Sequence, residues 1–185
     1  MDNHYNHFKK IDAHSHIGKF GSPFNIDFDL QRLMEQMETY NIEKTILCPA
    51  GCHLNEELKE AYEAAPDKIL PLCWVNANEG QEAYDMLEHY LRDENFAGIK
   101  MQPLFDAFTA DSPMVDPIME IAEAYQKPVF IHCGHPPYSL PWQIGLLAER
   151  HPHVPTVMIH MGHGHGVYIE GSLNMAYKYD NLFLE

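Results

Sequence analysis

Histidine is the residue type whose number and spacing in this sequence most clearly indicate chemistry. His14 and His16 stand one residue apart in the segment KKIDAHSHIG, and His132 and His160 each lie near the end of a later apolar run. Neutral imidazole binds zinc and other divalent transition metals, and a catalytic metal site keeps one coordination position for water or substrate. These four histidines therefore form a candidate metal centre, provided that the fold brings them together.

The elements that would position these histidines are short apolar runs that recur about every 25 to 35 residues, the size of a strand–helix unit. Each run ends at Gly, Pro, Asn or His, and patterns of this kind are typical of parallel strands buried on both faces. Amphipathic helical patterns separate the runs, which predicts an α/β fold with a parallel sheet. The seven predicted strands are residues 8–16, 44–50, 68–76, 96–103, 127–134, 154–162 and 181–185.

The helical patterns show one apolar stripe each, as amphipathic helices do. Leu30, Leu33, Met34 and Met37 form such a stripe, and Asp111 or Ser112 is expected to cap the helix that begins near Pro113. The pattern over residues 166–180 is interrupted by Gly171.

The periodicity alone is compatible with an open doubly wound sheet and with a closed barrel. A dinucleotide-binding open sheet carries GxGxxG after its first strand, whereas this chain has HSHIGKFG there and no P-loop. Seven such strands favour a (β/α)8 barrel of the TIM-barrel type, which usually takes about 250 residues. With 185 residues, the chain is expected to be a single domain, residues 1–185, truncated after about seven strands. It would be either a fragment or a chain whose gap a partner subunit closes in a homo-oligomer.

In such a barrel the C-terminal ends of the strands form the functional face. His14 and His16 are expected to point to the same side of the first strand, because side chains alternate along a strand. His132 would lie at the same end of the fifth strand and His160 at that end of the sixth. The alternative is a set of buried histidines that hydrogen-bond to backbone carbonyls.

Composition excludes several classes of partner. The chain has 12 basic and 27 acidic residues and a net charge of −15, so nucleic acid is not expected to bind. No apolar stretch approaches the roughly 20 residues of a membrane span. The first residues lack the apolar core of a signal peptide, which predicts a cytoplasmic protein. Four cysteines without CxxC spacing are expected to be reduced thiols.

The segments DAHSHIG, GIKMQP, PVFIHCG and VMIHMGH resemble, in order and spacing, the amidohydrolase superfamily. They are most similar to its amidohydrolase-related branch of metal-dependent hydrolases and decarboxylases. The resemblance implies a barrel with a divalent metal at the strand ends, zinc foremost and manganese as the alternative. It implies that His14, His16 and His132 are the metal ligands and that His160 is the catalytic acid–base group, or a further ligand in binuclear members. The family's strand-eight aspartate has no counterpart in these 185 residues, so the chain alone is expected to be poorly active.

Other residues are expected to serve the substrate. Lys100 would contact a substrate anion, with a carbamate bridging two metals or a local ion pair as alternatives. His135 would shape the substrate pocket. His163 and His165 belong to the glycine-rich segment HMGHGHG, which would contact substrate or a second metal, or form a solvated loop. Asp12 is expected to be a supporting group rather than a ligand.

These expectations predict a metal-dependent hydrolase that activates water for attack on an amide, ester or lactone of a small molecule. His160 would stabilise developing charge or move the proton. A non-oxidative decarboxylase on the same scaffold is the first alternative, because the same residues serve both reactions. A truncated homologue that binds metal without catalysis is the second.

Overall fold

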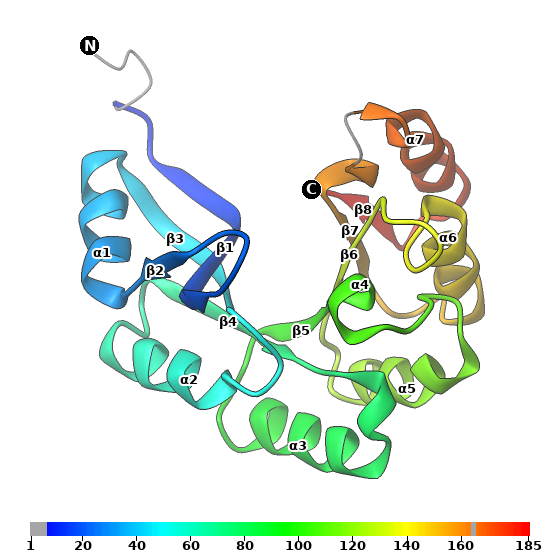
Figure 1. Ribbon diagram of the computed structural model, residues 1–185, viewed down its shortest axis with the longest axis horizontal. Helices are drawn as coiled ribbons and strands as arrows, with labels where there is room; N and C mark the ends of the chain where they lie inside the picture. Colours follow the sequence, from blue (N-terminus) through cyan, green and yellow to red (C-terminus); the bar gives the residue numbers. More distant parts are fainter. Residues whose placement is uncertain (1–6, 164–165) are drawn as a thin grey trace. The chain divides into compact units, whose positions relative to one another are not determined.

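The computed structural model describes residues 7–163 and 166–185 of the chain. Its packing divides the chain into two compact units, Met1–Trp74 and Val75–Glu185. Each unit is built mainly of parallel strands with helices packed against them, as the alternating sequence pattern predicts (Figure 1). The two units are described separately below.

The first unit contains β1 (Lys10–Phe20), β2 (Ile26–Phe28), α1 (Leu30–Thr39), β3 (Ile42–Pro49), α2 (Asn55–Ala64) and β4 (Ile69–Trp74). The strand order is β2-β1-β3-β4, with β1, β3 and β4 parallel and β2 antiparallel to the end of β1. Both helices pack on β3. They bury the apolar side chains of Leu33, Met37 and Leu58. Asp29 caps α1 by accepting a hydrogen bond from the Arg32 amide at 2.9 Å.

A buried asparagine joins α2 to β4. The Nδ2 atom of Asn55 donates to the Trp74 carbonyl at 2.9 Å, and the Trp74 amide donates to Asn55 Oδ1 at 2.8 Å. Asn55 Nδ2 also donates to the Cys52 carbonyl at 3.1 Å. Asn55 and Trp74 are each 2% exposed, so water does not compete for these bonds. The pair therefore specifies where the helix begins against the strand.

The second unit contains β5 (Gly98–Met101), β6 (Val129–His132), β7 (Thr156–Ile159) and β8 (Leu182–Leu184), which pair in this order and are all parallel. The strands β5 and β6 are buried almost throughout, as their uninterrupted apolar runs predict. The helical elements of the unit are η1 (Ala77–Glu79), α3 (Gln81–Arg92), α4 (Pro103–Asp106), η2 (Pro113–Val115), α5 (Asp116–Ala124), α6 (Pro141–Arg150), η3 (His160–Gly162) and α7 (Ile169–Lys178).

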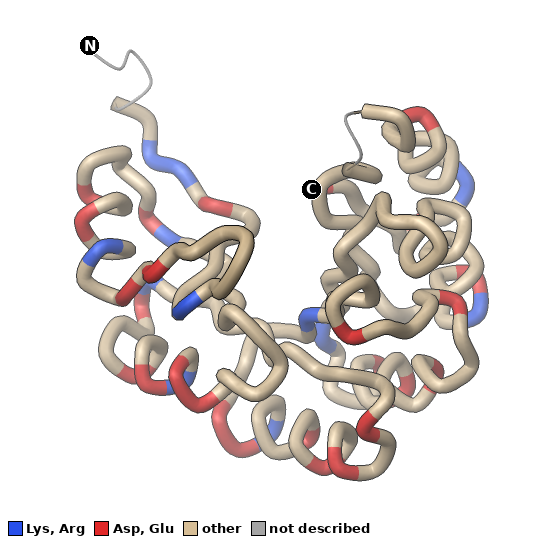
Figure 2. The backbone as a smooth tube through the Cα atoms, viewed as in Figure 1, with Lys and Arg blue, Asp and Glu red and all other residues tan. Residues whose placement is uncertain are grey.

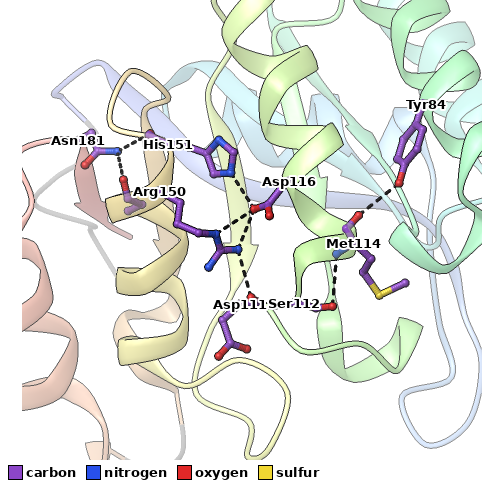
Figure 3. A network of polar contacts seen from close by, with 9 residues as sticks. Tyr84, Asp111, Ser112, Met114, Asp116, Arg150, His151 and Asn181 are labelled. Atoms are coloured by element: carbon purple, nitrogen blue, oxygen red, sulfur yellow. Dashed lines mark hydrogen bonds and ion pairs between the residues drawn. The ribbon is translucent and has the colours of Figure 1, made fainter.

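A polar network joins the start of α5 to the end of α6 (Figure 3). Asp116 Oδ1 accepts hydrogen bonds from Arg150 Nη2 at 2.8 Å and Nε at 3.0 Å, and from His151 Nε2 at 2.8 Å. Burial raises the pKa of Asp116, but the hydrogen bonds and charges of His151 and Arg150 outweigh it and hold this pKa below its usual value. Asn181 extends the network by contacting the backbone carbonyls of Ala148, His151 and Val154.

The predicted elements form, and the structure adds two features. Each of the seven predicted strand ranges overlaps a parallel strand, with β1 extending past the predicted end at residue 16 and β3 beginning two residues before the predicted start at residue 44. Ser112 caps the turn that leads into α5, and α7 runs through Gly171. The unpredicted strand β2 pairs with Gly18–Phe20 of β1. The other addition is a β-bulge in β1: Asp12 pairs with Thr45 but Ser15 with Leu47, so β1 carries one extra residue there.

The placement of acidic residues and the state of the cysteines agree with what the sequence predicts. Acidic residues lie along α2 and α3, among others, in keeping with the net charge of −15 (Figure 2). All four cysteines are free thiols, and Cys48, Cys73 and Cys133 are buried. No helix within residues 7–163 and 166–185 is long and apolar enough to cross a membrane.

Candidate metal centre

The histidine pair of the first unit lies on β1. The ring centroids of His14 and His16 are 4.7 Å apart, so both imidazoles approach the same spot. The bulge interrupts strict alternation next to His14, and the proximity of the rings therefore depends on the bulge as well as on the spacing. Asp12 Oδ1 accepts a hydrogen bond from the His14 amide at 3.3 Å, in the bulge. The His16 ring contacts Phe20 and Trp74, with centroid distances of 5.4 and 6.3 Å.

The hydrogen bonding of His16 determines which ring nitrogen can bind a metal. Its Nδ1 lies 3.0 Å from the Pro49 carbonyl oxygen, which can only accept a hydrogen bond. Nδ1 therefore carries the proton in the neutral ring, and the lone pair lies on Nε2. A hydrogen bond of this kind to the second nitrogen orients metal-binding histidines in general. Ligand atoms of His14, His16 and Cys48 lie within 4.8 Å of one another, and Cys48 was not predicted as a ligand because its apolar run suggested a core thiol.

Four histidines form one cluster in the second unit. The ring centroid of His132 lies 4.9 Å from that of His135, 4.9 Å from His160 and 5.7 Å from His163. The centroids of His135 and His163 are 4.8 Å apart. His132 is the last residue of β6 and His160 directly follows β7, so the strand-end placement predicted for both is confirmed.

Two glycines allow the loops that carry these histidines to approach each other. Gly134 has a φ of +99°, and a Cβ there would lie 2.0 Å from the Gly162 carbonyl oxygen. Gly162 has a φ of +90°, and its Cβ would lie 2.7 Å from Ser172 Oγ. A larger residue at Gly134 would push the two loops apart, whereas one at Gly162 would collide with Ser172 and with the Tyr168 backbone. Among the described residues that follow β7, three non-glycine residues have positive φ, namely His160 (65°), Met161 (46°) and His163 (36°).

The electrostatics keep His132, His135 and His160 in the neutral form that binds metals. Burial, the charge of Lys100 and the neighbouring histidines together lower the pKa of His132 to about 2 and that of His160 to about 4. Burial also lowers the pKa of His135. These rings are therefore neutral at pH 7, the state in which imidazole binds metals. His132 Nε2 is buried and has no hydrogen-bond partner among the described residues, which is rare for a buried polar atom.

Two charged residues lie beside the cluster. Lys100 is fully buried in β5, and its charge acts on both His132 and His160. Glu185 follows β8; its Oε2 accepts a hydrogen bond from the His160 amide at 3.1 Å and lies 3.9 Å from His160 Nδ1. The sequence reasoning missed Glu185, although a carboxylate at the end of the last apolar run could have indicated it.

The predicted site residues thus fall into two groups, one in each unit. His14 and His16 lie together on β1, while the second unit brings together His132, His135, His160 and His163, with Lys100 beside them. His165 lies outside the described residues.

A hollow of about 550 Å³ lies elsewhere in the first unit, beside β1, β2 and α2. Apolar side chains and carboxylates line it together, the carboxylates being those of Asp27, Asp29, Glu57 and Glu60. Lys19 also lines the hollow and lies 3.4 Å from Asp27, so the carboxylates outnumber the one cation and the hollow is unsuited to an anionic substrate.

A protein-family model described as Amidohydrolase matches residues 11–185. The chain belongs to the amidohydrolase family. Members of this family are enzymes, so the prediction of an enzyme class is confirmed at that level. A search of curated proteins finds no match.

Solved structures show the fold of this amidohydrolase. A TIM-barrel protein of Bordetella bronchiseptica is 17% identical, with a TM-score of 0.78 over 96% of this chain and 74% of that one. A manganese-bound 5-carboxyvanillate decarboxylase mutant of Novosphingobium aromaticivorans is 14% identical, with a TM-score of 0.69 over 97% and 76%. A structure named as an amidohydrolase II is 14% identical, with a TM-score of 0.71 over 95% and 78%. The predicted α/β fold of the TIM-barrel type is therefore confirmed.

Proposed function

We propose that this amidohydrolase is a metal-dependent hydrolase that acts on an amide, ester or lactone of a small molecule. In this proposal His14, His16 and His132 bind one divalent ion, zinc foremost and manganese as the alternative. The observation that carries it is His132 Nε2, a buried imidazole nitrogen without a hydrogen-bond partner among the described residues. A buried polar atom left in this way costs free energy unless something occupies its lone pair.

The donor set fits a divalent transition metal. The His132 ring is neutral because burial and Lys100 lower its pKa, and the Pro49 carbonyl leaves the lone pair of His16 on Nε2. Imidazole nitrogens suit zinc, whereas the manganese of the related decarboxylase supports the alternative ion. A bound ion would supply Lewis acidity, which polarises a substrate carbonyl and makes a water molecule more acidic.

The residues around the cluster would manage charge and protons. His160 is neutral at pH 7 and can take a proton from an attacking water, and the Glu185 carboxylate 3.9 Å from its Nδ1 would stabilise the charged ring. The buried ammonium group of Lys100 would bind a carboxylate or another anionic group of the substrate. Because Lys100 lies away from water, this electrostatic attraction would be stronger than at the surface. His135 and His163 would contact the substrate at the edge of the cluster.

Decarboxylation on the same residues is the second candidate. The similarity to the 5-carboxyvanillate decarboxylase, over 97% of this chain, supports it. Lys100 would then bind the substrate carboxylate. His160, neutral at pH 7, would first take up a proton from water and then deliver it to the carbon that loses CO2. Both reactions use the same residues, so product analysis must separate them.

The test uses the purified full chain loaded with zinc or with manganese. Hydrolysis of amides, aryl esters and lactones is followed by acid release, and decarboxylation of hydroxylated aromatic acids by CO2 release. We expect acid release that disappears on chelation, returns with metal, and is lost in His14→Ala and His132→Ala but kept in the matched surface control His153→Ala. CO2 release alone would replace the hydrolase proposal with the decarboxylase. If the His14→Ala variant keeps both its bound metal and its turnover, the hydrolase and the decarboxylase proposals are both overturned.

A further inference from the structure

We infer that His132, His135 and His163 form a metal-binding site of their own within residues 75–185, which takes a transition-metal ion without His14 and His16. The proposed catalytic centre shares His132 with this site, but the inference does not depend on the reaction assigned above. One ligand atom of each of these three histidines lies within 4.8 Å of the other two.

The ligand-atom spacing of the triad is close to that of a small four-coordinate ion, and the stacked rings of His132 and His135, at an interplanar angle of 18°, need to turn so that their nitrogens point to it. Zinc–nitrogen bonds of about 2.0–2.1 Å place tetrahedral ligand atoms roughly 3.4 Å apart. Because the ligand atoms of the triad lie within 4.8 Å of one another, they need to approach by no more than about 1.5 Å to reach this spacing. His163 is exposed, so its ring can turn toward an ion without loss of core packing. One coordination position remains for water.

The backbone holds the triad in place independently of the first unit. His135 follows Gly134, and His163 follows Gly162, the two glycines whose backbones are in contact. A Cβ on Gly134 would lie 2.8 Å from the Cβ of His163, so the contact also determines where His163 stands. His163 itself keeps a φ of 36°, and such unfavourable backbone angles in non-glycine residues persist where the surrounding structure enforces them.

The donor chemistry selects the class of ion. Three imidazoles and no carboxylate form the triad, which favours zinc, cobalt, nickel or copper over magnesium and calcium. The orphaned Nε2 of His132 provides a buried nitrogen for such an ion. The nearby Lys100 charge opposes a cation, so the triad must compensate with good ligand geometry rather than with negative charge.

The test measures binding rather than turnover. The metal-free full chain with His14→Ala and His16→Ala is titrated with Zn²⁺ by calorimetry and with Co²⁺ by visible absorption, which distinguishes four-coordinate from six-coordinate cobalt. We expect one ion per chain and the strong absorption of four-coordinate cobalt. Adding His135→Ala and His163→Ala should weaken binding by more than the roughly 10- to 100-fold that loss of a supporting hydrogen bond costs.

The matched control adds His89→Ala and His153→Ala, two histidines outside the cluster, to the same background and should bind as the parent does. His163→Gln, at an exposed position and as the only change added to the His14→Ala, His16→Ala chain, guards against misfolding of the larger variants. It should also weaken binding, with an unchanged circular dichroism spectrum. The inference is overturned if the His14→Ala, His16→Ala chain binds no ion, or if its binding survives loss of His135 and His163. Failure of the proposed function looks different: the wild type would bind metal but turn over no substrate.

Discussion

Replacement of Gly134 by alanine tests the contact between the two histidine loops. The added methyl group would lie 2.0 Å from the Gly162 carbonyl oxygen, far below ordinary van der Waals contact of 3.4–4 Å. The φ of +99° adds a backbone penalty of about 1–2 kcal/mol for a residue with a Cβ. Overpacking of this kind costs a further 1–3 kcal/mol, approximately. We therefore expect Gly134→Ala to lower the free energy of unfolding by about 2–5 kcal/mol.

Gly80→Ala is the matched control, because Gly80 also has a positive φ, +57°, but a Cβ there would meet nothing within 4 Å. It should show the backbone penalty alone, so the two variants should differ by about 1–3 kcal/mol. Urea unfolding measures the free energies, and the melting temperature should fall by about 2–4 °C per kcal/mol for a chain of this length. Gly134→Ala should also displace His163 and weaken binding of Zn²⁺. Equal stabilities of the two variants would refute the backbone contact between the loops.

Three further predictions concern stability and thiol chemistry. Asp116→Asn should destabilise the protein by about 1–3 kcal/mol at pH 7. Because the pKa of Asp116 is lowered in the folded state, the difference in the free energy of unfolding between the wild type and this variant should be fully present above about pH 4. It should shrink as the pH falls through the folded pKa, and urea unfolding at several pH values measures it. Asn55→Ala leaves the buried Trp74 amide and carbonyl without their side-chain partner and should cost about 3 kcal/mol, whereas the exposed Asn78→Ala should cost much less in the same assay. A thiol reagent should label the half-buried Cys52 of the native chain first, as read by mass spectrometry; equal labelling of Cys133, whose pKa burial raises to about 12, would contradict its burial.

The order of strands and helices could be predicted from the sequence because most of these elements have a characteristic hydrophobic pattern of their own. Uninterrupted apolar runs such as VFIH require burial on both faces, and stripes such as Leu33 with Met37 require one buried face. The strand β2 and the bulge in β1 were missed because neither has a local pattern in the sequence. Residues 26–28 carry no alternation strong enough to indicate a strand, and a bulge depends on the register of the partner strand.

For the candidate site, strand-end position predicted which histidines gather but not how they are held. The placement of His132 and His160 follows from the ends of β6 and β7. The approach of His135 and His163 depends on the contact between Gly134 and Gly162, which lie in loops separated along the chain. Glu185 was missed because it accepts the hydrogen bond from the His160 amide only when β7 and β8 pair.

The sequence by itself determined the α/β class and the succession of parallel strands along the chain, and it indicated histidines that could bind a metal, because local hydrophobic periodicity and side-chain chemistry do not depend on distant contacts. Only the tertiary structure decided the state of those residues. The Pro49 carbonyl selects the tautomer of His16, burial and Lys100 keep His132 neutral, and two glycine backbones set the spacing of the histidine loops. Each of these effects comes from a group distant in the chain, and it acts only once folding has brought that group within a few ångströms.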